Sequence, residues 1–261
     1  MSGEEAQILS RREGTTGILT LSHPRRRNAF PPEMRRELFS RLVEYSEDPE
    51  VRAIVITGAD GHFSVGADLD RMRGREAMPL LGKRRQIGDT HAMIRFLRSG
   101  PKPVIAAIEG DAFGGGLSIA LACDFIVAAR SARIGTGFVK LGLLPDMGIM
   151  YLLPRRIGAV AARRMLMLGE PVSGERAHTL GLVDELAEEG DALGRALRFA
   201  AQFEDAAMLP LAVIKSVLAA DHLTIEDVFR TEIDMVPIAS GSDDSRERRR
   251  KFLERRNAPK D

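Results

Sequence analysis

The sequence is poor in cysteine and in the larger aromatic residues. Its single cysteine, Cys123, lies in an apolar run, which excludes a disulfide framework or a cysteine-ligated metal site and favours a buried residue in a reducing compartment. There is no tryptophan and there are only two tyrosines, which argues against aromatic platforms for single-stranded nucleic acid. The five histidines show no metal-ligand spacing, so we expect no metal site.

The sequence also lacks an excess of charge and a long hydrophobic run. Lysine and arginine number 38 against 37 aspartate and glutamate residues, so the balance does not require nucleic acid as a partner. No apolar run approaches the roughly 18 residues of a membrane span, and the polar start Met1–Arg12 contains no signal region. We therefore expect no membrane association and a cytoplasmic location. A chain of 261 residues suffices for one large domain, with or without a helical appendage.

Short β-branched runs alternate with helical patterns over the first two thirds of the chain. Helices are expected from Glu33 to Tyr45 and between Ile87 and Arg98. Such alternation indicates an α/β fold. The predicted strands are Gly17 to Ser22, Val51 to Thr57, Pro103 to Ile108 and Phe125 to Ala128.

From about Asp191 the pattern is helical, and no further strand is expected. Ser242, followed by two aspartates, is predicted to cap a last helix that is dense in arginine and glutamate. The charged stretch 246–256 fits either a solvated helix face or a binding surface.

A run of three glycines, Gly114 to Gly116, follows a predicted strand and opens an apolar helix. Unpaired N–H groups and a helix dipole meet at such a point, so the run fits an oxyanion site, and it equally fits close packing of strand against helix. The spacing does not match a dinucleotide fingerprint, and a P-loop needs lysine where Leu117 stands. Ser118 resembles the serine of a nucleophile elbow, but it lies inside the predicted helix instead of at the turn after the strand.

A second loop, residues 62–69, also follows a strand. If both loops present a backbone N–H to one ligand atom, they form an oxyanion hole. The motifs are F-S-V-G-A-D-L at 63–69, P-K-P-V-I-A-A-I-E-G at 101–110 and A-F-G-G-G at 112–116. With His23-Pro24, Asn28-Ala29 and residues 252–256, they resemble the enoyl-CoA hydratase/isomerase (crotonase) superfamily over nearly the whole chain.

The resemblance implies a crotonase-type spiral of repeated strand-strand-helix units over residues 1–195. For residues 196–261 it implies a C-terminal helical region that covers the coenzyme A site and assembles a homotrimer, or a hexamer of two trimers. It further implies that the backbone N–H groups of Ala67 and Gly115 polarise the thioester carbonyl of an acyl-coenzyme A. Coenzyme A is then part of the substrate, and no separate cofactor is expected.

The resemblance also implies a set of substrate-binding residues. Three adjacent arginines at 25–27 otherwise fit a solvated loop, although arginine suits phosphate well. The implied residues are Arg25 and Arg27 at coenzyme A, Ala67, Asp68 and Leu69 at the adenine, Gly114, Ser118, Phe138 and Pro145 elsewhere along the acyl-CoA, and Phe252 and Arg256 from a neighbouring subunit.

Two positions depart from the hydratases of that family, which activate water with two glutamates. Ser118 and Phe138 stand where the resemblance places these glutamates. A serine hydroxyl without a partner is too weak a base at neutral pH, and a phenyl ring transfers no protons. Hydration by the usual route is therefore not expected.

A carboxylate stands instead at Asp146, in the sequence Leu144-Pro-Asp-Met147. Its pattern alone favours a cap for a helix from Met147 to Leu153. Isomerase and dehalogenase branches of the family carry an aspartate here, and the neighbourhood most resembles the ring-epoxide isomerases of phenylacetate breakdown and their enoyl-CoA isomerase relatives. We expect Asp146 to be partly buried among its apolar neighbours and to move a proton between two carbons. Two N–H donors, each worth about 3 kcal/mol, would hold the enolate.

The sequence thus predicts an acyl-CoA isomerase that shifts a double bond or rearranges an unsaturated thioester. The alternatives are a hydratase with a differently placed acid, a hydrolase or dehalogenase that uses Asp146, and a non-catalytic acyl-CoA-binding protein. Among other polar residues, His91 fits a core or rim histidine and His62 an exposed one. Asp111 fits a turn carboxylate or an acid that acts on substrate.

Overall fold

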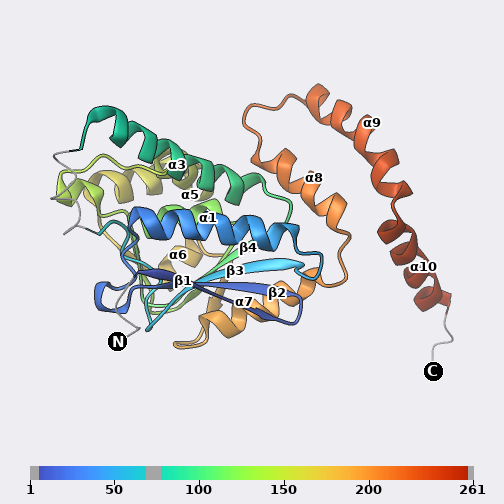
Figure 1. Ribbon diagram of the computed structural model, residues 1–261, viewed down its shortest axis with the longest axis horizontal. Coiled ribbons are helices and arrows are strands. Elements are labelled where there is room, and N and C mark those ends of the chain that lie inside the picture. Colours follow the sequence, from blue (N-terminus) through green and yellow to red (C-terminus); the bar gives the residue numbers. More distant parts are fainter. Residues whose placement is uncertain (1–5, 69–77, 258–261) are drawn as a thin grey trace.

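The computed structural model describes residues 6–68 and 78–257, and its centre is a six-stranded sheet (Figure 1). The first two strands form an antiparallel hairpin, and all later neighbours in the sheet pair in parallel. In sheet order the strands are β1 (Gln7–Glu13), β2 (Thr16–Ser22), β3 (Ala53–Gly58), β4 (Val104–Ile108), β6 (Phe125–Ala129) and β9 (Glu185–Ala187). The four predicted strands are all present, with ends that differ by at most two residues.

A second, three-stranded sheet lies beside the first and consists of very short strands. The sequence predicted none of these strands, because two or three residues carry no readable alternation. They are β5 (Asp111–Phe113), β7 (Arg133–Gly135) and β8 (Val172–Ser173).

Helices cover both faces of the main sheet, so its strands are buried on both sides. One face of β3 presents Ile54 and Ile56 to the core that holds most of the helices. The other face presents Ala53 and Val55 to α7. The helices of the first core are α1 (Pro32–Glu47), α3 (Leu80–Ser99), α4 (Gly115–Ala122), α5 (Ile149–Leu168) and α6 (Gly174–Thr179), and α7 spans Ala192–Ala200. This is the α/β organisation that the sequence predicted.

Three further helices form an arm, residues 208–257, that projects from this body (Figure 1). Its helices are α8 (Met208–Ala219), α9 (Ile225–Gly241) and α10 (Asp243–Asn257). The predicted division between residues 195 and 196 falls inside α7, which packs along the sheet, so the part that leaves the body begins only at α8. Within the described residues, no strand follows β9, and Ser242 accepts the N–H of Ser245 at the start of α10, as expected.

One buried ion pair joins the arm to the main sheet. Lys215 on α8 donates to the Asp124 carboxylate at 2.7 Å and to the Lys102 carbonyl at 2.8 Å. Burial raises the pKa of the Asp124 carboxyl, and the Lys215 charge opposes that rise. Loss of one partner would leave an uncompensated buried charge, so this contact fixes where α8 meets the body. Among the helices that the structure describes, none is long and apolar enough to span a bilayer.

Candidate active site

Two loops that follow strands of the two different sheets lie against each other. We call residues 59–67, after β3, the β3 loop, and Gly114–Gly116, after β5, the glycine loop. Ser64 of the β3 loop pairs with Ala112 as an isolated parallel bridge, and its carbonyl accepts the N–H of Phe113 at 2.9 Å. Because the backbones pair directly, the ends of both loops reach the same place in the fold. The sequence predicted this neighbourhood correctly.

Glycine is required where the two loops touch. A Cβ atom at Gly66 would lie 2.8 Å from the Gly115 nitrogen, and one at Gly116 would lie 2.3 Å from the Ser64 carbonyl oxygen. Gly66 also has a φ of +87°, which L-residues with side chains rarely adopt. The close packing that was one interpretation of these glycines is therefore present, and it positions Ala67 beside Gly115.

The glycine loop opens α4, a helix whose eight residues are all buried. The first N–H groups of a helix have no intrahelical partner, and the positive end of the dipole lies there. Among the described residues, nothing accepts a hydrogen bond from the N–H of Gly115 or of Ala67. Both N–H groups are thus left without a protein acceptor among the described residues.

Ala67 and Gly115 both line a cleft of about 480 Å³. Most of the lining is apolar or glycine, and the charged residues are Arg26, Asp68 and Lys140. Such a lining suits a largely apolar ligand with a few polar groups. The other lining residues are Ala29, Val65, Phe113, Gly114, Thr136, Gly137, Phe138, Leu141 and Leu143.

Ser118 and Phe138, which the resemblance places where hydratases carry glutamates, both lie close to Gly114. Ser118 is fully buried, and its hydroxyl faces the carbonyl oxygens of Gly114 at 3.1 Å and Asp146 at 3.4 Å. Phe138 begins a short 3-10 helix, η2 (Phe138–Leu141), and its ring lies 3.6 Å from where a Cβ of Gly114 would be. The ring is buried and forms part of the cleft wall.

Asp146 lies in the loop between η2 and α5, and the expectation that it is partly buried is wrong. Its side chain is exposed rather than partly buried, because Leu144 is 77% exposed and does not cover it. It also caps no helix, since α5 begins at Ile149 after Gly148. The next residue, Met147, is buried with a φ of +55°, and its sulfur lies 3.1 Å from where a Cβ of Gly115 would be.

The predicted coenzyme A residues are only partly brought together within one chain. Arg26, and not Arg25 or Arg27, lines the cleft. Phe252 and Arg256 are exposed on α10, at the far end of the arm (Figure 1). Asp68 is buried in the cleft wall, Pro145 lies half-buried beside Asp146, and Leu69 lies outside the described residues.

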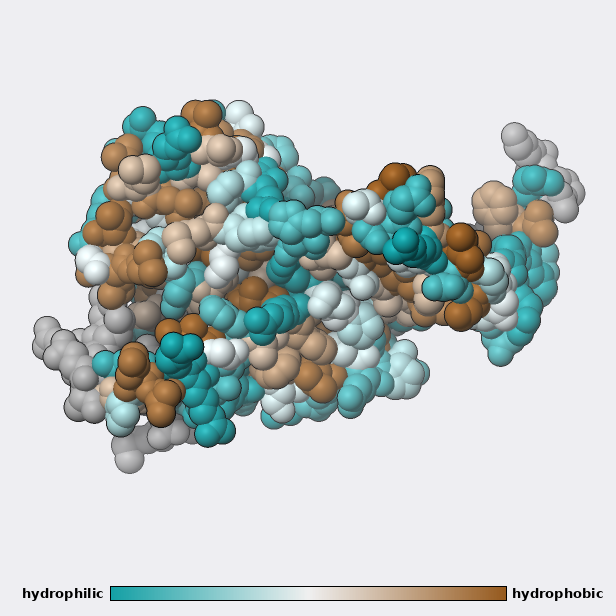
Figure 2. Space-filling view, turned by 90° about the horizontal axis from the view of Figure 1, so that it is seen from above, coloured by the Kyte–Doolittle hydropathy of each residue, from teal (hydrophilic) through white to brown (hydrophobic). Residues whose placement is uncertain are grey.

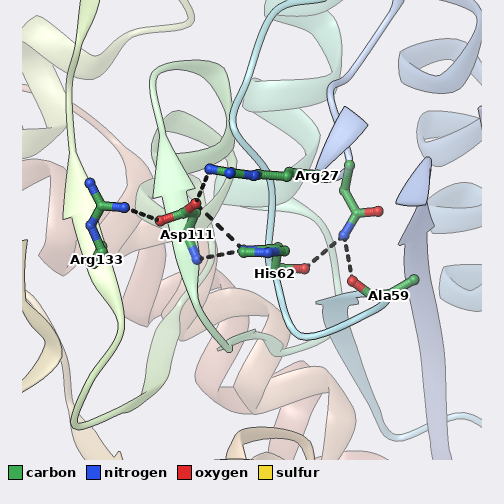
Figure 3. Close-up of polar contacts among 6 residues, drawn as sticks. Arg27, Ala59, His62, Asp111 and Arg133 are labelled. Atoms are coloured by element: carbon green, nitrogen blue, oxygen red, sulfur yellow. Dashed lines mark hydrogen bonds and ion pairs between the residues drawn. The ribbon is translucent and has the colours of Figure 1, made fainter. Parts of the chain in front are cut away.

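A cluster of charges that the sequence did not predict surrounds Asp111 (Figure 3). Asp111 is a strand residue rather than a turn residue, and its nearly buried carboxylate lies 3.2 Å from Arg27 and 3.4 Å from Arg133. His62 is only partly exposed and points at the same carboxylate from 3.5 Å, so the expectation of an exposed histidine is wrong. Arg27 is 84 residues away in sequence, which is why no local pattern revealed the pairing.

His91 is half-buried on α3 and is not part of the cleft lining. Within residues 6–68 and 78–257, no three His, Cys, Asp or Glu side chains are grouped to hold a metal ion. The cleft therefore offers the backbone N–H groups of Ala67 and Gly115, a mostly apolar wall and three charged side chains, and Asp146 is not part of its lining. Such an arrangement suits a substrate whose carbonyl oxygen gains negative charge.

Comparison with known proteins assigns the chain to a family. The family model "Enoyl-CoA hydratase/isomerase" matches residues 11–260, and the chain belongs to that family. It is 34% identical to the 1,2-epoxyphenylacetyl-CoA isomerase of Escherichia coli, over 96% of each chain. It is 37% identical to human enoyl-CoA hydratase domain-containing protein 2, mitochondrial, over 83% of this chain and 74% of the relative.

A solved structure gives the same result for the fold. The crystal structure of an enoyl-CoA hydratase from Polaromonas sp. JS666 superposes with a TM-score of 0.90 at 38% identity, covering 95% of this chain and 97% of that one. The fold is therefore the crotonase fold, as the sequence motifs implied. Relatives at similar identity carry both hydratase and isomerase names, so the comparisons establish the enoyl-CoA hydratase/isomerase family and do not decide between the two reactions.

Proposed function

We propose that the protein is an acyl-CoA isomerase that moves a double bond along an unsaturated acyl-CoA thioester, with Asp146 as the proton shuttle. The observation that carries the proposal is the identity of the residues around the glycine loop. By the resemblance, Ser118 and Phe138 stand where hydratases carry their two acids, and the Ser118 hydroxyl lies 3.4 Å from the Asp146 carbonyl oxygen. The loop from η2 to α5 therefore brings the backbone of Asp146 next to α4, and we assign the proton transfer to its carboxylate.

The chemistry requires only one acid. In a 3-enoyl-CoA, the Asp146 carboxylate takes a proton from C2, and the electron pair moves toward the thioester oxygen. The N–H groups of Ala67 and Gly115 hold the resulting dienolate oxygen, each donor contributing about 3 kcal/mol to its stabilisation. The protonated Asp146 then returns the same proton to C4, and the product is the conjugated 2-enoyl-CoA.

The exposure of Asp146 means that this mechanism works only if bound substrate shields its carboxylate from water. An exposed carboxylate exchanges its proton with water, so the acyl group must cover Asp146 when the substrate binds. The apolar wall of Phe138, Leu141 and Leu143 would hold such a group and keep water from the dienolate. A hydratase needs a positioned water at the same place, and a phenyl ring provides no group to hold one.

The experiment follows conversion of a 3-enoyl-CoA to its conjugated isomer by ultraviolet absorbance, in wild type and in Asp146→Asn. We expect Asp146→Asn to lower kcat by about 100- to 10,000-fold, with acyl-CoA binding retained. The matched control is Asp205→Asn, which changes an exposed carboxylate outside the cleft and should leave the rate unchanged.

The same assay separates the rival functions. Conversion of a 2-enoyl-CoA to a 3-hydroxyacyl-CoA would favour a hydratase, and release of free coenzyme A would favour a hydrolase. Binding of acyl-CoA without turnover of either isomer would favour a non-catalytic binding protein. Full activity of Asp146→Asn would refute the role of Asp146.

We further propose that the arm assembles the chain into a homotrimer, or a hexamer of two trimers. In the single chain, α8 and α9 present large apolar side chains to solvent, which Figure 2 shows as brown surface along the arm. Leu218 is 78% exposed and Ile233 is 73% exposed. Contiguous apolar surface of this kind marks a protein interface. The exposed apolar residues are Ile214, Leu218, Ile225, Phe229, Ile233, Val236 and Ile238.

Sedimentation tests the assembly. Wild type should sediment at three or six times the chain mass, and the double variant Leu218→Asp, Ile233→Asp should sediment as smaller species. Leu81→Asp changes an equally exposed apolar residue outside the arm and serves as the control. A monomeric wild type would refute the proposal.

A further inference from the structure

The charge cluster around Asp111 lies against the β3 loop and outside the cleft. The carboxylate is only 5% exposed, whereas Arg27 and Arg133, which pair with it, are 61% and 63% exposed. Figure 3 shows Arg27 and Arg133 reaching Asp111 from opposite sides, with His62 beside them. This nearly buried carboxylate holds two mainly exposed guanidinium groups, and its role is to fix the segments that carry them.

The backbone of Asp111 is hydrogen-bonded to the β3 loop. Its carbonyl oxygen accepts the N–H groups of Phe63 at 3.1 Å and Ser64 at 2.9 Å, and its own N–H lies 3.4 Å from the His62 ring nitrogen. The start of β5 thus holds three consecutive residues of the β3 loop.

Arg27 and Asn28 are also hydrogen-bonded to the β3 loop. The Arg27 carbonyl accepts the N–H of Val65 at 3.1 Å. The Asn28 carbonyl accepts the Ser64 hydroxyl at 2.7 Å, and that hydroxyl in turn accepts the N–H of Gly66 at 3.1 Å. Two residues of the N-terminal segment therefore fix Ser64, Val65 and Gly66, directly before Ala67.

Arg27 and Asn28 hold this position in an uncommon backbone conformation. Their φ angles are +46° and +56°, in the left-handed region that residues with side chains rarely adopt. Asn28 is anchored by its amide, which donates to the carbonyls of Ala59 and His62 (Figure 3). The pairing with Asp111 anchors Arg27 in the same way.

We propose that Asp111 is a positioning residue for the Ala67 N–H donor: its carboxylate holds Arg27, and Arg27 and Asn28 hold the β3 loop. Asp111 does not touch the substrate. The carboxylate fixes one of the two donors that would polarise the thioester, so its removal weakens the reaction without emptying the cleft. The inference rests on the proposed oxyanion role of Ala67, and it does not depend on which reaction Asp146 performs.

The pair Arg27 and Arg133 supplies a matched comparison. Both contact the same carboxylate at similar distances and with similar exposure, but only Arg27 belongs to the segment that holds the β3 loop. Arg27→Gln should lower kcat by about 10- to 100-fold with KM little changed, because a donor displaced by about 1 Å costs up to a hundredfold. Arg133→Gln should leave kcat unchanged, and Arg27→Lys should restore part of the loss.

A spectroscopic measurement separates this inference from the proposed isomerase activity. Cinnamoyl-CoA carries a conjugated acyl group whose absorbance band moves to longer wavelength when its carbonyl is polarised. Wild type and Arg133→Gln should both shift the band of bound cinnamoyl-CoA, and Asp111→Asn and Arg27→Gln should lose most of the shift. This result stands even if no enoyl-CoA is isomerised.

The contrary outcomes are equally definite. A full band shift in folded Asp111→Asn, or a rise of KM with constant kcat in Arg27→Gln, would overturn the inference. The second result would instead make Arg27 a coenzyme A ligand. Circular dichroism establishes that each variant is folded, and if Asp111→Asn does not fold, the Arg27→Gln and Arg27→Lys pair decides alone.

Discussion

The two sides of the cleft are built differently. On one side, the β3 loop is hydrogen-bonded to β5 and lies so close to the glycine loop that a methyl group at Gly66 or Gly116 would meet backbone. On the other side, residues 138–148 enter the core through Phe138 and Met147 while Leu141, Leu144 and Asp146 are exposed. The side with the two loops therefore tolerates little change in side-chain volume, whereas exposed positions on the other side can be substituted with less effect on packing. In the proposed function, the closely packed side polarises the carbonyl, and a few exposed residues on the other side decide the reaction.

The largest effect is expected from breaking the closely packed side with Gly116→Ala. The added methyl group would lie 2.3 Å from the Ser64 carbonyl oxygen, so one loop must move away from the other. We expect kcat to fall by at least about 100-fold, because both donors are displaced. Thermal unfolding should show a loss of about 1–3 kcal/mol from overpacking.

Gly88→Ala is the control for that change, because a Cβ at Gly88 on α3 meets nothing within 4 Å. The control should gain about 0.5–1 kcal/mol from helix propensity and keep its activity. Equal activity of Gly116→Ala and wild type would show that contact between the loops does not set the donor geometry.

A smaller effect is expected from opening the apolar wall with Phe138→Ala. Truncation of this buried ring should lower the free energy of unfolding by about 3 kcal/mol and leave space beside Gly114. Water entering that space should appear as a hydrated by-product, which mass spectrometry detects as an added water mass on the acyl-CoA. Phe138→Leu keeps the wall apolar and should form little of it. Absence of hydrated product in Phe138→Ala would mean that the ring does not keep water out.

The smallest effect is expected from Lys140→Gln, at the exposed edge of the cleft. Stability should change by no more than about 0.5 kcal/mol. KM for an acyl-CoA should rise a few-fold at about 0.01 M salt, where charges act over about 30 Å, and the difference should vanish near 1 M salt. A KM difference that persists at high salt would indicate a direct hydrogen bond from Lys140 instead of a long-range attraction.

Strands and helices could be predicted from the sequence where their apolar or charged pattern extends over enough residues. Strands such as β3 and β4 were predicted because five consecutive buried residues in each leave a clear apolar run. The edge strand β1 was missed, since only Ile8 of its seven residues is buried and the rest show no alternation. The helical arm was predicted because its apolar and charged patterns extend over whole helices.

The site shows the same limit more sharply. The contact between the two loops could be predicted from their glycines, because only glycine allows two backbones to approach so closely. The exposure of Asp146 was not readable, because it depends on which other segments cover the loop. The pairing of Asp111 with Arg27 and Arg133 depends on strand register and on a left-handed turn, neither of which leaves a local pattern.

Two glycines bracket the segment that carries Asp146. Gly142 and Gly148 have φ angles of +67° and +79°, so the chain turns sharply at each end of residues 143–147. Between them only Met147 is fully buried. Residues 143–147 therefore meet the core mainly through Met147. A replacement of this segment that keeps Met147 and both glycines could place a different acid there without redesign of the core. If Asp146 acts as proposed, such a replacement would change which reaction the chain performs on a thioester.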